Sequence, residues 1–281
     1  MSGVATGGIL LDGSRLAVDV RGTGRPLLLL HGFSGSAATW AELAEGWIDG
    51  HRCIVPDLLG HGRSDAPRDP ARYGLERQAD DLAALLDVLE ACPAEVAGYS
   101  LGARLALQLA LGHPGSVRSL ALESPSAGIA DATERARRRA ADERLAQQLE
   151  QDGLAAFVDA WQAQAIFESH ARLSPEVRDR LRAERLSHDT RGLAAALRGA
   201  GQGAMVPLHD RLGDIRCPVL VIAGELDATG HERAEAVAGA IPGSRLEIVA
   251  GAGHTPHLEQ AAAFAGLLSA FLDAHRAIPS H

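Results

Sequence analysis

Short apolar runs alternate along this chain with longer segments whose apolar residues recur at helical spacing. Continuous apolar runs of this length are typical of strands that are buried on both faces of a parallel sheet. The runs span residues 26–30, 53–56, 95–99, 117–122, 218–223 and 245–249. The helical segments between them include residues 75–90, 102–111, 232–240 and 260–274. The alternation predicts an α/β fold, in which helices flank a mostly parallel sheet.

Two segments depart from this alternation. Residues 9–11 and 15–20 lie on either side of Asp12-Gly13, a dipeptide typical of tight hairpins, so the chain should open with antiparallel strands. Residues 128–206 are rich in arginine and alanine, have helical spacing and contain no convincing strand. We expect a core of residues 1–127 and 207–281, with residues 128–206 inserted as a helical cap.

The charged residues exclude several classes of function. The formal net charge is −9, so no global positive field attracts nucleic acid or an anionic membrane. All 27 basic residues are arginines, because the sequence contains no lysine. A lysine Schiff base, a Walker-type phosphate-binding lysine and a kinase-type lysine are therefore impossible.

The spacing of the cysteines and the length of the apolar runs indicate where the protein is located and whether cysteines bind a metal. Cys53, Cys92 and Cys217 are widely spaced and odd in number, which argues against a disulfide framework or a cysteine metal site. No apolar run approaches the roughly 20 residues that a membrane span needs. Residues 1–8 lack a signal-peptide layout. We expect a cytoplasmic protein without a bound metal, and the sequence does not indicate an oligomeric state.

Residues 98–102 read Gly-Tyr-Ser-Leu-Gly between a predicted strand and a predicted helix. This G-x-S-x-G pattern turns the chain sharply and holds the serine in a strained, exposed position at the carboxyl end of the strand. The following helix directs its first N–H groups toward the same space. Ser100 is therefore the candidate catalytic hydroxyl.

A serine hydroxyl needs an imidazole to take its proton and a carboxylate to orient that imidazole. His254 lies in a small-residue loop after the last predicted strand and is the favoured base, with His257 as its nearest rival. Asp227 follows a predicted strand and gives the chain order Ser, Asp, His. Glu225 and Glu123 are the alternatives to Asp227, and Glu123 ends the preceding sheet strand.

The loop that begins at His31-Gly32-Phe33 could supply part of an oxyanion site. It follows the predicted strand 26–30 and is rich in glycine and serine. The backbone N–H of Phe33, together with that of Leu101 after the candidate serine, could hold an oxygen on which negative charge develops.

These motifs resemble those of α/β-hydrolase-fold enzymes over nearly the whole chain. The resemblance rests on residues 31–33, 57–64, 98–102, 224–227 and 253–254. It implies the α/β-hydrolase fold with an inserted helical cap, and a triad of Ser100, Asp227 and His254.

Within that superfamily the chain resembles the 2-succinyl-6-hydroxy-2,4-cyclohexadiene-1-carboxylate synthases, which are lyases of menaquinone biosynthesis. The likeness lies in an arginine after the elbow and in the cap segments 128–142, 161–167, 185–187 and 192–199. The family's substrate carries three carboxylates, which arginine side chains bind in a bidentate manner. The resemblance implies elimination of pyruvate from a small anionic substrate, with the serine as the base and no cofactor.

The resemblance also implies substrate contacts outside the triad. These fall on His31, Tyr99, Arg104, Arg138, Trp161 and Arg185. The register around Arg138 stays open by one residue, and Arg182 is an alternative to Arg185.

Three positions depart from the family pattern and bear on the pocket wall. Ala165 stands where proline is usual, and residues 228–231 stand where a lysine and an aromatic residue are common. Pro256 stands where a small apolar residue is expected. Two other functions therefore stay open: a serine hydrolase with Ser100 as acyl nucleophile, and a small-molecule binding protein built on this fold.

Overall fold

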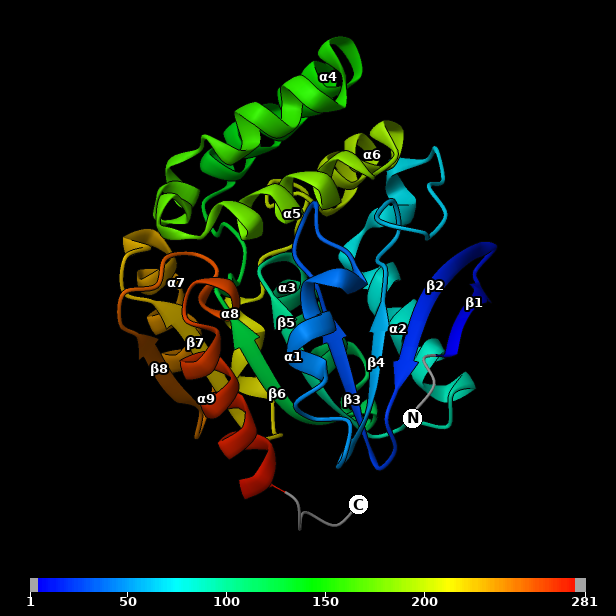
Figure 1. Ribbon diagram of the computed structural model, residues 1–281, viewed down its shortest axis with the longest axis vertical. Coiled ribbons are helices and arrows are strands. Elements are labelled where there is room, and N and C mark those ends of the chain that lie inside the picture. The colour runs from blue at the N-terminus through cyan, green and yellow to red at the C-terminus, as the bar shows by residue number, and fades with distance from the viewer. Residues whose placement is uncertain (1–4, 276–281) are drawn as a thin grey trace.

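The computed structural model describes residues 5–275 (Figure 1). Within this range eight strands form one sheet in the order β1-β2-β4-β3-β5-β6-β7-β8. The pairs β1·β2 and β2·β4 are antiparallel, and all other neighbours are parallel. The strands are β1 (Ala5–Leu11), β2 (Ser14–Arg21), β3 (Arg25–Leu30), β4 (His51–Pro56), β5 (Ala94–Tyr99), β6 (Val117–Glu123), β7 (Val219–Gly224) and β8 (Arg245–Val249). The predicted α/β sheet is confirmed.

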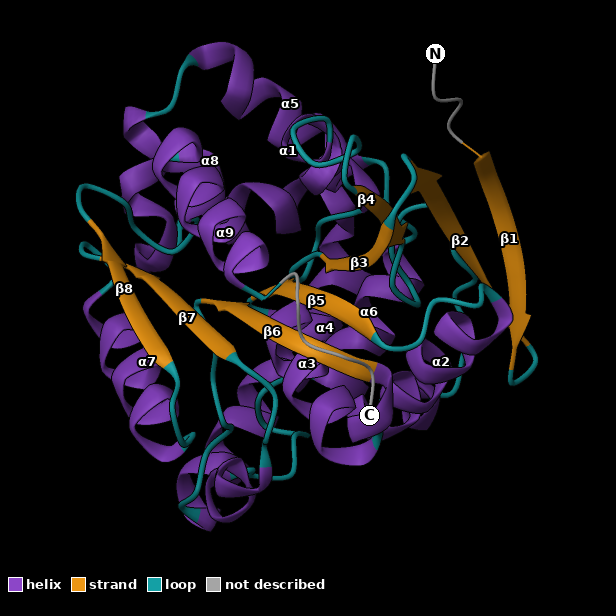
Figure 2. Ribbon diagram, turned by 90° about the horizontal axis from the view of Figure 1, so that it is seen from below, coloured by secondary structure: helices purple, strands orange, loops and turns teal. Residues whose placement is uncertain are grey.

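Helices cover both faces of this sheet. Figure 2 shows α1, α8 and α9 on one face and α2, α3 and α7 on the other. The α-helices are α1 (Ala41–Ala44), α2 (Leu75–Val88), α3 (Leu101–Gly112), α4 (Ala132–Gln162), α5 (Pro175–Leu186), α6 (Thr190–Ala200), α7 (Ala228–Ala240), α8 (Pro256–Glu259) and α9 (Ala261–Ala274). No helix among residues 5–275 combines the length and the apolarity that crossing a membrane requires.

The predicted N-terminal hairpin is confirmed. Leu11 pairs with Ser14, so Asp12 and Gly13 form a two-residue turn between β1 and β2. Both turn residues have positive φ, 42° and 74°, as the tightest hairpin turns require. A glycine accepts this conformation at no steric cost, and an aspartate tolerates it better than most residues do.

The run of four leucines in β3 supplies both hydrophobic cores. Successive side chains of a strand point to opposite faces, so Leu27 and Leu29 pack in one core while Leu28 and Leu30 pack in the other. All four side chains are fully buried. A strand that is apolar at every position therefore lies at the centre of the sheet, with helices on both sides.

The helices α4, α5 and α6 follow β6 and lie beyond the carboxyl ends of the parallel strands (Figure 1). Polar contacts connect them to the loops of the sheet. The Ser36 hydroxyl donates to Glu184 at 2.6 Å, and His188 contacts the carbonyl oxygen of Ser34 at 2.9 Å. The Gly62 N–H donates to the other ring nitrogen of His188 at 2.9 Å. These helices therefore cover the edge of the sheet where the candidate site lies.

Candidate active site

Ser100 lies in a sharp turn between β5 and α3. Its φ and ψ are 51° and −101°, a strained conformation for a residue with a side chain. The two glycines of the motif make the turn possible because the backbone approaches them closely. A Cβ on Gly102 would overlap the backbone oxygen of Leu30, and a Cβ on Gly98 would overlap that of Gly102. The motif therefore places the hydroxyl at the carboxyl end of β5, facing the space under α4–α6.

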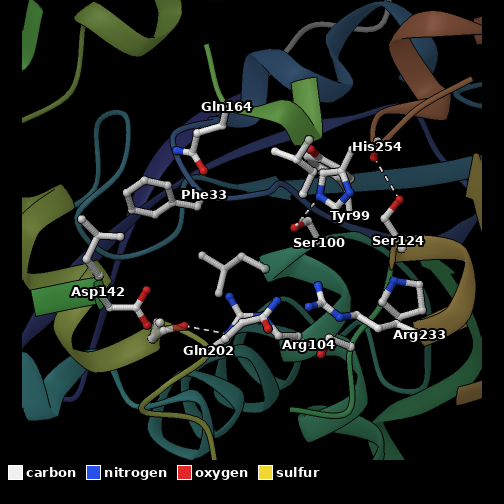
Figure 3. Close-up of a pocket in the computed structure, with 18 of the residues that line it drawn as sticks. Phe33, Tyr99, Ser100, Arg104, Ser124, Asp142, Gln164, Gln202, Arg233 and His254 are labelled. Atoms are coloured by element: carbon white, nitrogen blue, oxygen red, sulfur yellow. Dashed lines mark hydrogen bonds between the residues drawn. The ribbon is translucent and has the colours of Figure 1, made fainter. Parts of the chain in front are cut away.

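The side chains of Ser100, His254 and Asp227 form a continuous chain of contacts (Figure 3 shows the first two). The distance between His254 Nδ1 and Asp227 Oδ2 is 2.6 Å. Because a carboxylate only accepts, Nδ1 carries the hydrogen and Nε2 is left as an acceptor. His254 Nε2 lies 3.2 Å from Ser100 Oγ, within reach of its proton. This arrangement lets the imidazole take the hydroxyl proton while the carboxylate stabilises the imidazolium.

Asp227 is held in its ionised form. Burial raises the pKa of its carboxyl group, but the hydrogen bond and charge of His254 and the N–H of Gly230 together bring the pKa below its ordinary value. The Gly230 N–H donates to Asp227 Oδ1 at 2.9 Å, because Asp227 caps the N-terminus of α7. A capped carboxylate presents its second oxygen to His254 in a single orientation.

The sequence alternatives to this acid and this base have other partners. Glu123 and His257 are both buried and bind each other, with Glu123 Oε1 2.8 Å from His257 Nδ1. Glu225 accepts the N–H of Gly251 at 2.8 Å. The structure thus brings Asp227 and His254 to Ser100, and none of the three alternatives.

The backbone N–H groups of Phe33 and Leu101 suit an oxyanion site. Both residues line the cavity that contains Ser100. Within residues 5–275 neither N–H donates a hydrogen bond to another group of the protein. Leu101 begins α3, so its N–H also lies at the positive end of the helix dipole. Two unpaired donors beside the hydroxyl could stabilise developing negative charge on a substrate oxygen.

The expectation that His31 contacts the substrate is corrected by the structure. His31 is fully buried and does not line the cavity. The Leu58 N–H donates to its Nε2 at 3.0 Å, so Nδ1 carries the hydrogen that binds the Gly32 oxygen at 2.7 Å. With both ring nitrogens engaged by backbone, His31 fixes the start of the Phe33 loop. The motif predicts the loop correctly but assigns this side chain the wrong task.

His31 leads to a prediction about acid stability. Burial lowers its pKa from 6.5 to about 4, so the unfolded chain binds a proton between these values that the folded protein does not. Stability is therefore full above pH 6.5 and falls toward pH 4, by about 3 kcal/mol from this residue. The free energy of unfolding, measured with urea, should fall less between pH 7.5 and pH 5 for His31→Gln than for the wild type. The glutamine amide keeps an acceptor but does not titrate. An unchanged difference would contradict the assignment.

The candidate triad opens into a cavity of about 370 Å³. Among the described residues, its charged lining beyond the triad consists of Arg104, Arg138, Arg233 and Asp142. Arg138 Nε binds Asp142 Oδ1 at 2.7 Å, so one guanidinium is partly neutralised. The lining therefore carries an excess of positive charge.

Arg104 is the most deeply buried of these cations. Its Nη1 donates to the backbone oxygen of Ala200 at 2.8 Å, which leaves the rest of the guanidinium for a ligand. Burial, reinforced by the nearby charge of Arg138, lowers the pKa of Arg104 from 12.5 to about 10. It stays protonated at neutral pH, and its desolvation favours the arrival of an anion.

Two aromatic residues expected from the sequence also line the cavity, namely Tyr99 and Trp161. The Trp161 ring lies 5.0 Å from that of Phe33 and stacks on Phe157 at 5.6 Å. Its indole N–H is buried and has no partner within the described part of the chain. The aromatic side chains of this wall can pack against the apolar face of a substrate ring. The Trp161 N–H can donate one hydrogen bond to a polar substituent of the substrate.

The structure separates Arg185 from this cavity. Arg185 lies over the ring of Phe167, 5.2 Å from its centroid, and lines a different cavity on the other side of residues 164–167. Its alternative, Arg182, forms an ion pair with Asp159 at 2.9 Å. Of the three arginines expected from the sequence, Arg104 and Arg138 therefore reach the Ser100 cavity, and Arg185 does not.

Arg233 is a charged residue of the cavity that sequence reasoning missed. It lies on α7 and extends into the cavity toward Arg104 (Figure 3). The available signal was its spacing, because Asp227, Gly230 and Arg233 recur every three residues and so share one side of the helix. That spacing becomes informative only once the orientation of α7 is known.

Comparisons with known proteins identify the family of this chain. A family model described as the alpha/beta hydrolase fold matches residues 25–261. The chain is 41% identical to a Bacillus subtilis (strain 168) protein provisionally named 2-succinyl-6-hydroxy-2,4-cyclohexadiene-1-carboxylate synthase, over 93% of this chain and 96% of that protein. It is 31% identical to the synthase of that name from Klebsiella pneumoniae (strain 342), over 91% and 97%. The solved structure of MenH from S. aureus superposes with a TM-score of 0.87, at 32% identity over 90% and 95% of the chains.

Proposed function

Because this chain belongs to the α/β-hydrolase family, and within it to the family of the 2-succinyl-6-hydroxy-2,4-cyclohexadiene-1-carboxylate synthases, we propose that it is a pyruvate-eliminating lyase. Its substrate is 2-succinyl-5-enolpyruvyl-6-hydroxy-3-cyclohexene-1-carboxylate, and its ring product is 2-succinyl-6-hydroxy-2,4-cyclohexadiene-1-carboxylate. The cytoplasmic location expected from the sequence stays a prediction.

The observation that carries this proposal is the combination of the triad with cationic groups in one cavity. Arg104 and Arg138 lie in the same enclosure as Ser100, within a protein of net charge −9. An enzyme for neutral esters gains nothing from desolvated guanidinium groups and bears their cost. A substrate with three carboxylates offsets that cost through bidentate, charge-assisted hydrogen bonds.

The triad supplies the base. His254 takes the proton of Ser100, and the resulting alkoxide removes the proton from the ring carbon that bears the succinyl group. That proton is acidic because the adjacent succinyl carbonyl accepts the charge. Asp227 stabilises the imidazolium through the 2.6 Å contact with Nδ1. Ser100 acts here without forming a bond to carbon.

Loss of the enolpyruvyl group follows removal of the ring proton. The oxygen of the succinyl carbonyl gains negative charge and is held by the N–H groups of Phe33 and Leu101. The electrons of the broken C–H bond form a new ring double bond, the existing double bond shifts by one position, and the ring carbon–oxygen bond to the enolpyruvyl group breaks. The ring proton stays on Ser100 as its hydroxyl hydrogen, and the released enolpyruvate anion takes up, on carbon, one proton in exchange for the one that the His254 imidazolium gives up. The enolpyruvate thereby becomes pyruvate, and the triad returns to its starting state. The ring is left as the cyclohexadiene.

In this proposal residues 128–206 act as the cap of the site. They contribute Arg138, Asp142 and Trp161 to the cavity, while Ser100 and His254 come from the sheet. The cap thus closes the reacting centre from the side opposite to the sheet. Water exclusion in such an enclosure strengthens each electrostatic contact with the substrate.

The direct test measures pyruvate release from the enolpyruvyl substrate, which the preceding synthase generates in situ. A p-nitrophenyl ester is assayed in parallel, and spontaneous elimination is subtracted. Fast pyruvate release with little ester cleavage supports the lyase. Background-level release with rapid ester cleavage would replace the lyase with a serine hydrolase that uses the same triad.

Arg138 offers a prediction with a neighbouring control. Arg138→Gln should raise KM for the tricarboxylate by about 10-fold or more, because it removes a charge-assisted hydrogen bond. Cleavage of a neutral ester should be unaffected. Arg139→Gln changes the exposed next residue of α4, which does not line the cavity, and should behave like the wild type. Steady-state kinetics of the three proteins check this, and an equal loss on both substrates would show that Arg138 is structural.

A further inference from the structure

A second cavity, of about 770 Å³, adjoins the cavity that contains Ser100. Its wall includes residues that are exposed on the surface, among them Glu168, Arg172, Leu226 and Thr229, so it opens toward solvent. We call this space the outer cavity and the Ser100 cavity the inner cavity. A small molecule released in the inner cavity lies beside this opening.

Arg138 and Arg233 stand at the boundary between the two cavities. Together with Ala165 and Ile166 they line both spaces, whereas Arg104 lines the inner cavity alone. The two guanidinium groups come from different helices, Arg138 from α4 and Arg233 from α7. A boundary made of two cations and two apolar side chains selects for a small anion.

The two boundary arginines differ in how they are paired. Arg138 is held by Asp142 at 2.7 Å. Arg233 makes no hydrogen bond or ion pair with any residue that the structure describes, although it is partly buried. The outer cavity contains the carboxylates of Glu168 and Asp227, but Asp227 is committed to His254 and Gly230. Arg233 is therefore a partly buried cation that acts on Asp227 through its charge but whose hydrogen-bonding capacity is unused.

We propose that Arg233, together with Arg138, forms a carboxylate subsite at this boundary, and that it binds the carboxylate of the three-carbon group that leaves. This inference rests on the proposed lyase function for the identity of the anion. Its basis in the structure is the shared position of the two arginines at the boundary, together with the unused hydrogen-bond donors of Arg233 within residues 5–275. The guanidinium fork binds a planar carboxylate through two parallel hydrogen bonds.

The location explains why the leaving group, and not the ring, occupies this subsite. Elimination divides one anion into two, and the smaller product must depart before the next turnover. A carboxylate held at the boundary already faces the outer cavity, whereas one held at Arg104 is enclosed by the buried residues Leu101, Asp142 and Leu197. Arg104 is thus left for a carboxylate of the ring product.

The test begins with binding, which needs no turnover. Isothermal titration of pyruvate and, separately, of succinate into Ser100→Ala reports the subsite directly. Adding Arg233→Gln should raise the dissociation constant for pyruvate by about 10-fold or more, because a charge-assisted pair of hydrogen bonds is lost. Arg233→Lys should restore part of the affinity. Arg245→Gln, an exposed arginine of β8 remote from both cavities, is the matched control and should change nothing.

Kinetics then separate this inference from the proposed function. In the lyase assay, Arg233→Gln should weaken product inhibition by pyruvate by a similar factor. Wild-type pyruvate affinity and inhibition in Arg233→Gln, with a normal thermal midpoint, would overturn the subsite even if the lyase activity is present. Loss of succinate binding with intact pyruvate binding would reassign Arg233 to the succinyl arm and overturn the proposal. Arg233-dependent pyruvate binding without any lyase activity would keep the subsite and remove the proposed function.

Discussion

Ser100→Ala is expected to reduce pyruvate release from the enolpyruvyl substrate by about 1,000-fold, since a positioned base contributes roughly 100- to 10,000-fold to proton abstraction. The physical reason is the single path for the proton, which runs from Ser100 Oγ to His254 Nε2 over 3.2 Å. Alanine removes the group that touches the ring proton. Stopped assays of pyruvate, corrected for spontaneous elimination, measure the loss.

The matched control for this variant is Ser116→Ala. Ser116 lies just before β6, at the opposite end of the sheet from the site, and should keep full activity. Circular dichroism should show the same thermal midpoint for both variants. If Ser100→Ala keeps activity within 10-fold of the wild type, the serine is not the base. His254 would then have to remove the ring proton directly.

Gly102→Ala is expected to destabilise the protein by about 3 kcal/mol or more, near the upper end of what overpacking costs. A Cβ at this position overlaps the backbone of Leu30 and approaches the His31 oxygen at 2.8 Å. These are main-chain atoms of the central strand β3 and of the loop that follows it, so they cannot move aside as a flexible side chain would. Urea unfolding monitored by tryptophan fluorescence measures the change.

Gly112→Ala provides the control within the same helix. Gly112 ends α3, and a Cβ there meets no atom within 4 Å. Alanine should leave stability unchanged or raise it by about 0.5 kcal/mol, because it restricts the unfolded chain. Equal effects of the two substitutions would show that helix propensity, and not the close approach of β3 to α3, determines the role of Gly102.

The fold could be predicted because its signals are local. A strand that is apolar at every position, such as 27–30, has only one stable environment, the centre of a sheet with both faces covered. Likewise, Asp12-Gly13 between two short strands determines an antiparallel opening. Each of these decisions is made within a few residues, so the printed sequence is sufficient for it.

The choice of acid and base was harder because two histidines and three carboxylates follow neighbouring strands. Chain order favoured Asp227 and His254, but it could not show that Glu123 and His257 bind each other. That pairing depends on how far α8 lies from the end of β6, a distance between elements that the sequence does not encode locally. The structure brings one candidate pair to Ser100 and buries the other away from the cavity.

Taken by itself, the sequence determined the sheet, the strained serine turn and the order of the triad candidates, because these follow from strand periodicity and from glycine sterics. Only the tertiary structure decided which arginines share the cavity with Ser100. Periodicity tells which face of a helix is apolar, but the placement of a helix over the sheet depends on packing between distant segments. Thus Arg185 lies over the ring of Phe167 and does not line the Ser100 cavity. Arg233, from the helix α7 that packs on the sheet, does line it.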